Sequence, residues 1–169
     1  VLTFAQKNYG EVDKIAKGRK LTGEVKVLIK EINKNYSEMD FRLALRNILK
    51  ISDIGNTYFQ KAEPWKNKDD KKTKAAVGWC VNLARNLALM VSPILPEFSR
   101  KVASALGEEV LLWKWRDCGY NWKGQLNPVE MLMNKIEQLP VVEKFPLRMV
   151  VGEIIEVKNH PNADALYIL

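Results

Sequence analysis

The sequence predicts a mainly α-helical protein followed by the beginning of a β domain, and three observations support this prediction. Apolar residues recur with the period of an α-helix through most of residues 1–136. Pro140 and Pro146 then mark a linker over 137–147. Over 148–169 the pattern changes to an alternation rich in β-branched residues, which is typical of strands. We therefore expect a helical bundle, a linker and the first strands of a truncated β domain.

The composition excludes several classes of protein. Of the 169 residues, 47% are hydrophobic and 28% are charged. No apolar run approaches about 18 residues, so we expect no transmembrane helix. Cys80 and Cys118 are too few for a disulfide-rich secreted scaffold, and the single His160 argues against a His-rich metal site or a Ser-His-Asp triad. The chain starts at Val1 without a signal-peptide pattern, and we expect it to be a segment of a longer protein.

The net charge of +7 comes from the first half of the chain. Residues 1–75 contain 17 Lys and Arg against 10 Asp and Glu, whereas residues 76–169 contain 10 of each. Clustered lysines neutralise phosphates and release condensed counterions, so a polyanionic partner is one explanation. A solvated lysine-rich surface is the other explanation, and charge alone does not decide between them.

The first 37 residues predict two helices. The pattern of residues 1–10 predicts the end of a helix that stops at Gly10. Residues 11–21 are predicted to form a charged loop. From Thr22 the apolar side chains fall on one face of a second helix, whose apolar positions are Val25, Leu28, Ile29 and Ile32.

A third helix is predicted over about 38–62. The segment 37–40 supplies an N-cap and acidic residues for its first turn, and Pro64 ends it. Ser52 and Gly55 lower helix stability in its middle. We therefore expect the backbone of another helix to cross closely there.

The second half begins with the most apolar helix of the chain, predicted over 75–92 with Asp69 and Asp70 serving its N-terminus. A further helix is expected over 95–106, an irregular aromatic-rich segment over 108–127, and a short helix from Asn127-Pro128 to Ile136. The apolar helix should be the centre of the core.

The end of the chain predicts a hairpin. A strand is expected over 149–157, a turn at 160–164 and a second strand from 166. Two strands do not form an independently stable sheet, which is why we expect the β domain to be truncated.

The sequence contains no catalytic signature. Glycine-rich phosphate loops, Cys-x-x-Cys, Gly-x-Ser-x-Gly and His-Glu-x-x-His motifs are all missing from it. The acidic pairs at 69–70 and 108–109 lie in polar, loop-like surroundings, and Cys80 lies within an apolar helix. We expect no catalytic residue and no metal ligand in this chain.

Trp65 directly follows the helix-ending Pro64 and precedes a run of lysines. An indole held at a helix tip can stack on an unpaired base while ammonium groups hold phosphates. The same tryptophan could instead fold back and cap the core. The lysines concerned are Lys66, Lys68, Lys71, Lys72 and Lys74.

Three motifs in this region belong together: Phe41-x-x-Ala44-Leu45-x-x-Ile48-Leu49, Gly55-Asn56-x-Tyr58 and Ala62-Glu63-Pro64-Trp65. They resemble the anticodon-binding helix bundle of the class I methionyl-tRNA synthetases, in the archaeal/eukaryotic-like form. Pro93-Ile94-Leu95-Pro96, Trp113 and Asn127-Pro128 extend the resemblance. The motifs alone also fit class I synthetases for other hydrophobic amino acids.

The end of the chain favours methionine among these amino acids. Val151-Gly152-x-Ile154 and His160-Pro161-Asn162-Ala163-Asp164-x-Leu166-Tyr167 are similar to the opening of the tRNA-binding OB-fold module that is appended to many methionyl-tRNA synthetases. The resemblance thus covers nearly the whole chain, with an anticodon-binding domain over 1–136 and a truncated OB-fold over 148–169.

The resemblance implies that Trp65, positioned by Pro64, recognises the anticodon CAU by stacking. The other two anticodon readers of the family, an Asn and an Arg, correspond to positions before Val1. The expected tRNA phosphate contacts are Lys61, Lys66, Lys68, Lys71 and Lys72.

For the longer protein, the resemblance implies attachment of methionine to tRNA(Met) in the cytoplasm. ATP and Mg²⁺ would bind in a catalytic domain outside this chain, which itself needs no cofactor. The adenylate-forming signatures His-Ile-Gly-His and Lys-Met-Ser-Lys-Ser do not occur here, so we expect no catalysis by this segment alone. The family's OB-fold module often makes the enzyme a homodimer, and no membrane association is implied.

A protein-interaction module of a larger assembly is the alternative from a different class. It would dock through the aromatic residues of 113–122, which could form an exposed hot spot. Such a segment can equally pack over the bundle as a lid.

Overall fold

The computed structural model describes residues 1–16, 19–109, 114, 118–133, 158–159 and 167–168. The chain divides into two compact units, Val1–Asn134 and Lys135–Leu169. In the second unit β3 (Lys158–Asn159) pairs antiparallel with β4 (Tyr167–Ile168). The predicted linker over 137–147, the strand over 149–157 and the turn at 160–164 lie outside the described residues, so the domain boundaries stay predictions.

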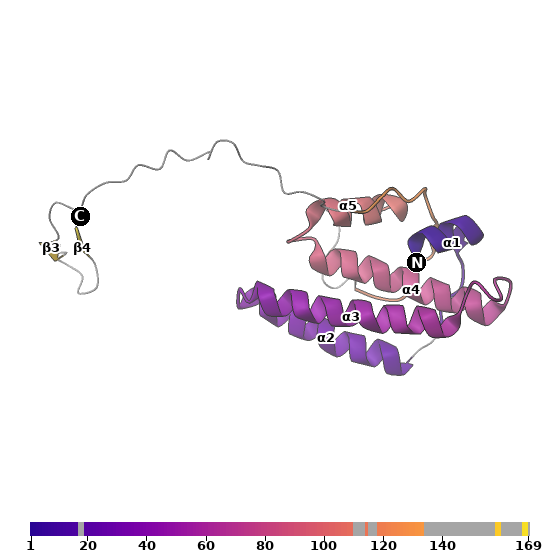
Figure 1. Ribbon diagram of the computed structural model, residues 1–169, viewed down its shortest axis with the longest axis horizontal. Helices are drawn as coiled ribbons and strands as arrows, with labels where there is room; N and C mark the ends of the chain where they lie inside the picture. Colours follow the sequence, from indigo (N-terminus) through magenta and orange to yellow (C-terminus); the bar gives the residue numbers. More distant parts are fainter. Residues whose placement is uncertain (17–18, 110–113, 115–117, 134–157, 160–166, 169) are drawn as a thin grey trace. The chain divides into compact units, whose positions relative to one another are not determined.

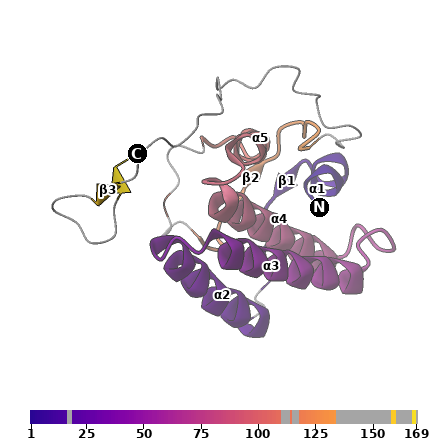
Figure 2. The same ribbon diagram turned by 60° about the vertical axis from the view of Figure 1, so that its left-hand side comes forward.

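The described residues of the first unit form α1 (Leu2–Asn8), α2 (Arg19–Ser37), α3 (Phe41–Ala62), α4 (Lys71–Val91) and α5 (Pro96–Ala105). Helix α2 packs on α3, and α4 lies between α3 and the helices α1 and α5 (Figures 1 and 2). The mainly α-helical fold is therefore confirmed. None of the helices in the described part is long and apolar enough to span a bilayer.

Helix α4 is the centre of the core, as its sequence predicts. Trp79 and Leu83 belong to the apolar cluster shared with α2 and α3. Val77 and Val81 belong to a second cluster, shared with α1 and α5. Because α4 is covered on both sides, it carries apolar residues around more than one face.

Helices α3 and α4 cross closely at Gly55. A Cβ atom at this position would lie 2.4 Å from Cδ2 of Leu83, a buried side chain of α4. Close packing at this mid-helix glycine is therefore present, but a side chain of α4 fills the space and not the helix backbone that the sequence predicted.

The start of α3 differs from the prediction. Helix α2 continues through Ser37 and ends before Met39, whose φ of 59° is incompatible with a right-handed helix. The N-cap is Asp40, which accepts a hydrogen bond from the backbone N–H of Leu43 at 2.9 Å. Helix α3 consequently begins at Phe41, and the expected start at Glu38 was wrong.

The predicted loop over 11–21 contains two elements instead. Residues of β1 (Glu11–Val12) pair antiparallel with β2 (Gly124–Gln125), and α2 already begins at Arg19. Strands of two residues are too short to show an alternating pattern, so only the long-range pairing reveals them.

The short helix expected from Asn127 is not formed in residues 127–133. The backbone N–H of Asn127 donates to the carbonyl of Ala105 at 2.9 Å, and its side-chain amide donates to the carbonyl of Ser104 at 2.8 Å. Asn127 thereby satisfies the last carbonyls of α5 rather than starting a helix.

Two asparagines of α4 hold the aromatic segment that follows α5. Asn82 accepts a hydrogen bond from the N–H of Trp122 at 2.8 Å and donates to its carbonyl at 3.1 Å. Asn86 bonds to the N–H and carbonyl of Gly119 in the same way, at 3.0 and 3.1 Å. These side-chain amides therefore replace the backbone partners that a neighbouring strand would supply.

The segment held in this way packs on the bundle. Tyr120 stacks on Trp79, with ring centroids 5.1 Å apart and planes 7° from parallel. Its described residues therefore form a lid rather than an exposed docking surface. Trp113 and Trp115, which the interaction-module hypothesis also needs, lie outside the described residues.

Candidate nucleic-acid interface

The connection between α3 and α4, residues 63–70, is called the tip here, and it exposes Trp65 to solvent. Helix α3 ends at Ala62, and Glu63 takes the left-handed conformation, with φ 40° and ψ 54°. This residue turns the chain so that Pro64 is fully buried, whereas Trp65 stays 46% exposed. The proline is therefore the anchor, and the indole is the group that it presents.

A row of aromatic rings, Phe4 and Phe59, packs against one side of the Trp65 indole. The ring of Phe59 on α3 lies 6.2 Å from that of Trp65, tilted by 59°. Phe59 in turn meets Phe4 of α1 edge to face at 5.7 Å. One side of Trp65 thus contacts the bundle while about half of its surface can receive a planar ligand. This arrangement differs from the core cap that was the alternative interpretation of Trp65.

The predicted lysines differ in their surroundings. Lys61 is exposed in the last turn of α3 and lines a groove of about 360 Å³ together with Glu24 and Asp53. Lys66 forms an ion pair with Glu63 at 2.7 Å. Lys61 and Lys66 therefore have acidic neighbours, and neither is an unopposed positive charge.

Lys68, Lys71 and Lys72 are exposed around the start of α4. Asp70 caps this helix by accepting hydrogen bonds from the N–H groups of Lys72 and Thr73, both at 3.1 Å, which confirms its expected role. Within the helix, however, the first turn contains lysines and no acidic residue. Cations at a helix N-terminus oppose its dipole and cost roughly 0.3–1 kcal/mol each. A bound polyanion would relieve this local conflict.

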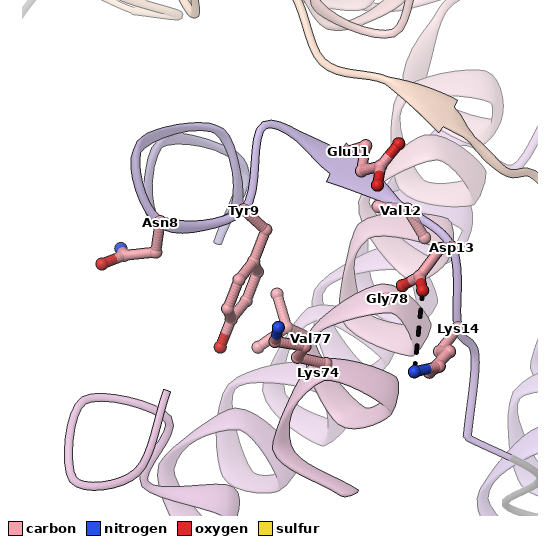
Figure 3. Close-up of a pocket in the computed structure, with 9 residues that line it drawn as sticks. All are labelled: Asn8, Tyr9, Glu11, Val12, Asp13, Lys14, Lys74, Val77 and Gly78. Atoms are coloured by element: carbon pink, nitrogen blue, oxygen red, sulfur yellow. Dashed lines mark ion pairs between the residues drawn. The ribbon is translucent and has the colours of Figure 1, made fainter. Parts of the chain in front are cut away.

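A pocket beside the tip contains residues that sequence reasoning did not combine. Its volume is about 160 Å³, and it lies between α1, β1 and the start of α4 (Figure 3). Tyr9 and Lys74 line one side, with the Lys74 ammonium 5.7 Å from the centre of the Tyr9 ring, and Lys14 lies on the other side. No local pattern relates these three residues, because only the packing of α1 and β1 against α4 brings them together.

The other groups considered for chemistry have structural roles. Asp70 is the cap of α4, and Glu108 accepts a hydrogen bond from Arg85 at 2.7 Å. Burial raises the pKa of Cys80 to about 12, so its thiol is neutral and unreactive at physiological pH. His160 lies outside the described residues.

Comparison with known proteins matches residues 10–137 to the family described as the anticodon binding domain of methionyl tRNA ligase. A methionine–tRNA ligase of Borrelia turicatae is 36% identical over 173 residues, covering 99% of this chain and 23% of that protein. The methionine–tRNA ligase of Methanosarcina acetivorans is 34% identical over 110 residues, covering 64% of this chain and 15% of that protein. The chain thus spans less than a quarter of the length of these curated relatives.

A solved structure shares the fold. The apo form of Mycobacterium tuberculosis methionyl-tRNA synthetase superposes with a TM-score of 0.68 at 20% sequence identity, covering 77% of this chain and 29% of that one. At this level of identity the similarity concerns the arrangement of helices alone.

Proposed function

The chain belongs to the family of anticodon-binding domains of methionyl-tRNA ligases, and from this premise we propose that it recognises the CAU anticodon of tRNA(Met) by stacking a base on Trp65. The observation that carries the proposal is the contrast between neighbours at the tip, where Pro64 is fully buried and Trp65 is 46% exposed. A buried proline with a fixed φ holds the next residue in place, so little conformational entropy is lost when a base stacks on it.

The surroundings of Trp65 suit a single-stranded ligand. Phe59 blocks one side of the indole and leaves the remaining surface for one base. Lysines around the tip supply the charge that attracts phosphates without reading sequence. Lys61, Lys66, Lys68, Lys71 and Lys72 are the proposed phosphate contacts; Lys66 forms an ion pair with Glu63, and Asp69 and Asp70 lie between Lys68 and Lys71 in the chain.

For the longer protein we propose the cytoplasmic activity of methionine–tRNA ligase. Methionine, ATP and Mg²⁺ would bind in a catalytic domain outside this chain, since neither adenylate-forming signature occurs in its sequence. This chain would position and check the tRNA. Dimerisation of the longer protein through an OB-fold module that starts near residue 148 is part of the same proposal. The family match favours methionine over the other hydrophobic amino acids.

Binding of an anticodon stem-loop with a CAU loop tests the role of Trp65. Trp65→Ala should weaken binding by about 10- to 100-fold, since a base stacked on an aromatic ring contributes roughly 1–3 kcal/mol. Trp65→Phe should retain part of the affinity. Phe41→Ala is a matched control, because Phe41 is 50% exposed at the opposite end of α3. It should leave RNA binding unchanged.

Urea unfolding of the same variants separates stacking from a role in the core. Truncation of a buried tryptophan costs about 3–5 kcal/mol, whereas loss of a half-exposed one should cost much less. If Trp65→Ala unfolds the domain and its folded fraction still discriminates CAU normally, the stacking role is wrong.

A further inference from the structure

We propose that the pocket lined by Tyr9, Lys14 and Lys74 holds one phosphate of the bound RNA backbone. This inference rests on the proposed function, because an RNA must first be bound at the tip. It adds a concave anchor with defined donors to the exposed lysines that the sequence indicated.

The hydroxyl of Tyr9 is the first of these donors. It is buried, and no described group forms a hydrogen bond with it. Burial raises the pKa of Tyr9, and the negative charge of Asp69 raises it further, so the hydroxyl keeps its proton at neutral pH. A buried donor without an acceptor is unfavourable and uncommon in folded proteins. The hydroxyl is covered in this structure, so a phosphate oxygen in the pocket would supply the acceptor once the groups over it move aside on binding.

Two ammonium groups add positive charge from opposite walls. Lys74 lies over the Tyr9 ring, and Lys14 reaches in from the segment after β1 (Figure 3). Lys14 has an ion pair with Asp13, but the separation is 3.7 Å and both side chains are about half exposed. Such a pair contributes little free energy, so Lys14 can exchange its partner for a phosphate at low cost. In Figure 3 the carboxylate of Glu11 points away from both lysines.

The pocket is close enough to Trp65 for one RNA segment to occupy both. The ring of Phe4 lies 6.1 Å from Tyr9 and 5.7 Å from Phe59, and Phe59 lies 6.2 Å from Trp65. These contacts form a continuous aromatic row from the tip to the pocket. A few nucleotides of a single strand span such a row.

The chemistry of the lining favours a phosphate over a base. Reading a base edge needs a side chain with both donor and acceptor, such as an amide, or a bidentate Arg. The one amide of the lining, that of Asn8, donates to the carbonyl of Phe4 at 2.8 Å and points away from Lys14 in Figure 3. Besides the carboxylates of Glu11 and Asp13, the remaining polar groups of the lining are a phenol and two ammonium ions, which are donors to an anion.

The test measures binding of CAU stem-loop RNA to the 169-residue chain between about 0.1 and 1 M salt. One phosphate contact on a single strand contributes a slope of about 0.7 in log affinity against log salt. Lys74→Met and Lys14→Met should each weaken binding about fivefold at roughly 0.1 M salt, lower the slope by about that amount, and act equally on stem-loops with other loop sequences. Lys30→Met, on the exposed face of α2, is the matched control and should change neither quantity.

Tyr9→Phe separates binding from folding. Removing an unpartnered buried hydroxyl should leave the free energy of unfolding unchanged or raise it, while RNA binding falls. Stem-loops with one neutral methylphosphonate at each loop position then locate the phosphate. At one position the substitution should weaken binding to the wild-type chain and not to Lys74→Met.

The outcomes distinguish this inference from the proposed function. If Trp65→Ala weakens binding while the variants of Tyr9, Lys14 and Lys74 bind like the wild-type chain, the phosphate site is wrong and the function stands. Losses that depend on loop sequence would assign a base to the pocket and also overturn the inference. Absence of RNA binding by the wild-type chain would overturn both.

Discussion

The carbonyl oxygen of Lys14 occupies the space that a side chain at Gly78 would need. A Cβ atom there would lie 2.0 Å from this oxygen and 3.0 Å from Cγ1 of Val12. The segment after β1 therefore packs directly on the backbone of α4. Beside it the N–H of Ala16 donates to the carbonyl of Ala75 at 2.8 Å. This close approach forms the floor of the pocket shown in Figure 3.

Gly78→Ala should lower the free energy of unfolding by about 1–3 kcal/mol, because the added methyl group displaces a backbone atom that cannot rotate away. The steric cost of the methyl group should exceed the roughly 1 kcal/mol by which alanine stabilises a helix interior relative to glycine. Gly23→Ala is the matched control in α2, where nothing lies within 4 Å of the added Cβ. Urea unfolding followed by far-UV circular dichroism should show the control stabilised. Equal stabilisation of both variants would contradict the contact.

Glu63→Gly should stabilise the tip relative to Glu63→Ala. Glu63 has a φ of 40°, and a residue with a Cβ pays roughly 1–2 kcal/mol in the left-handed region, whereas glycine does not. Both variants remove the ion pair with Lys66, so their difference isolates the backbone conformation. Thermal and urea unfolding should place Glu63→Gly about 1 kcal/mol above Glu63→Ala. RNA affinity should fall in Glu63→Gly if its added flexibility loosens Trp65.

Lys72→Met should change stability and RNA binding in opposite directions. Lys72 lies in the first turn of α4, where its charge opposes the helix dipole, so its removal should raise the free energy of unfolding by about 0.3–1 kcal/mol. The same variant should bind stem-loop RNA more weakly and with a smaller salt dependence. Paired unfolding and binding measurements check this, with Lys30→Met as the variant that should alter neither. A parallel loss of stability and binding would indicate a structural role for Lys72.

Alkaline pH should destabilise the fold through Cys80. Burial raises the pKa of this thiol from 9.0 to about 12, so between these values the unfolded chain has lost a proton that the folded chain keeps. Stability is therefore fully present below about pH 9 and falls as pH rises toward 12. Raising the pH from 9 to 10 should cost about 1 kcal/mol through this group. Urea unfolding at both pH values checks this, and Cys80→Ala should lose less than the wild-type chain over the same interval.

The sequence predicted the elements whose signals are local. Helix α4 has apolar residues around most of its circumference and an aspartate before its first turn, and the structure places it in the centre with Asp70 as its cap. Gly55 in the middle of α3 indicated close packing against another helix, and the Leu83 side chain of α4 lies there in place of the predicted backbone. Each of these signals depends on a side chain and its neighbours within a few turns, which is why sequence reasoning reached them.

The elements that sequence reasoning missed depend on distant partners. The pairing of β1 with β2 joins Glu11 to Gln125, and two-residue strands have no periodicity of their own. Asn127 was expected to start a helix, but the carbonyls at the end of α5 capture both its backbone and its side chain. The unpaired carbonyls at the end of α5 therefore outweighed the local tendency of Asn127-Pro128 to start a helix.

The candidate site also has features that the sequence predicts and features that depend on tertiary packing. The sequence by itself determined that an aromatic residue follows a helix-ending proline in a lysine-rich segment, because proline, helix period and charge are properties of adjacent residues. Only the tertiary structure decided that Pro64 is buried while Trp65 is half exposed, and that Tyr9, Lys14 and Lys74 share a pocket. Burial and proximity are set by the packing of α1 and β1 against α4, and that packing sums contacts between residues far apart in the chain.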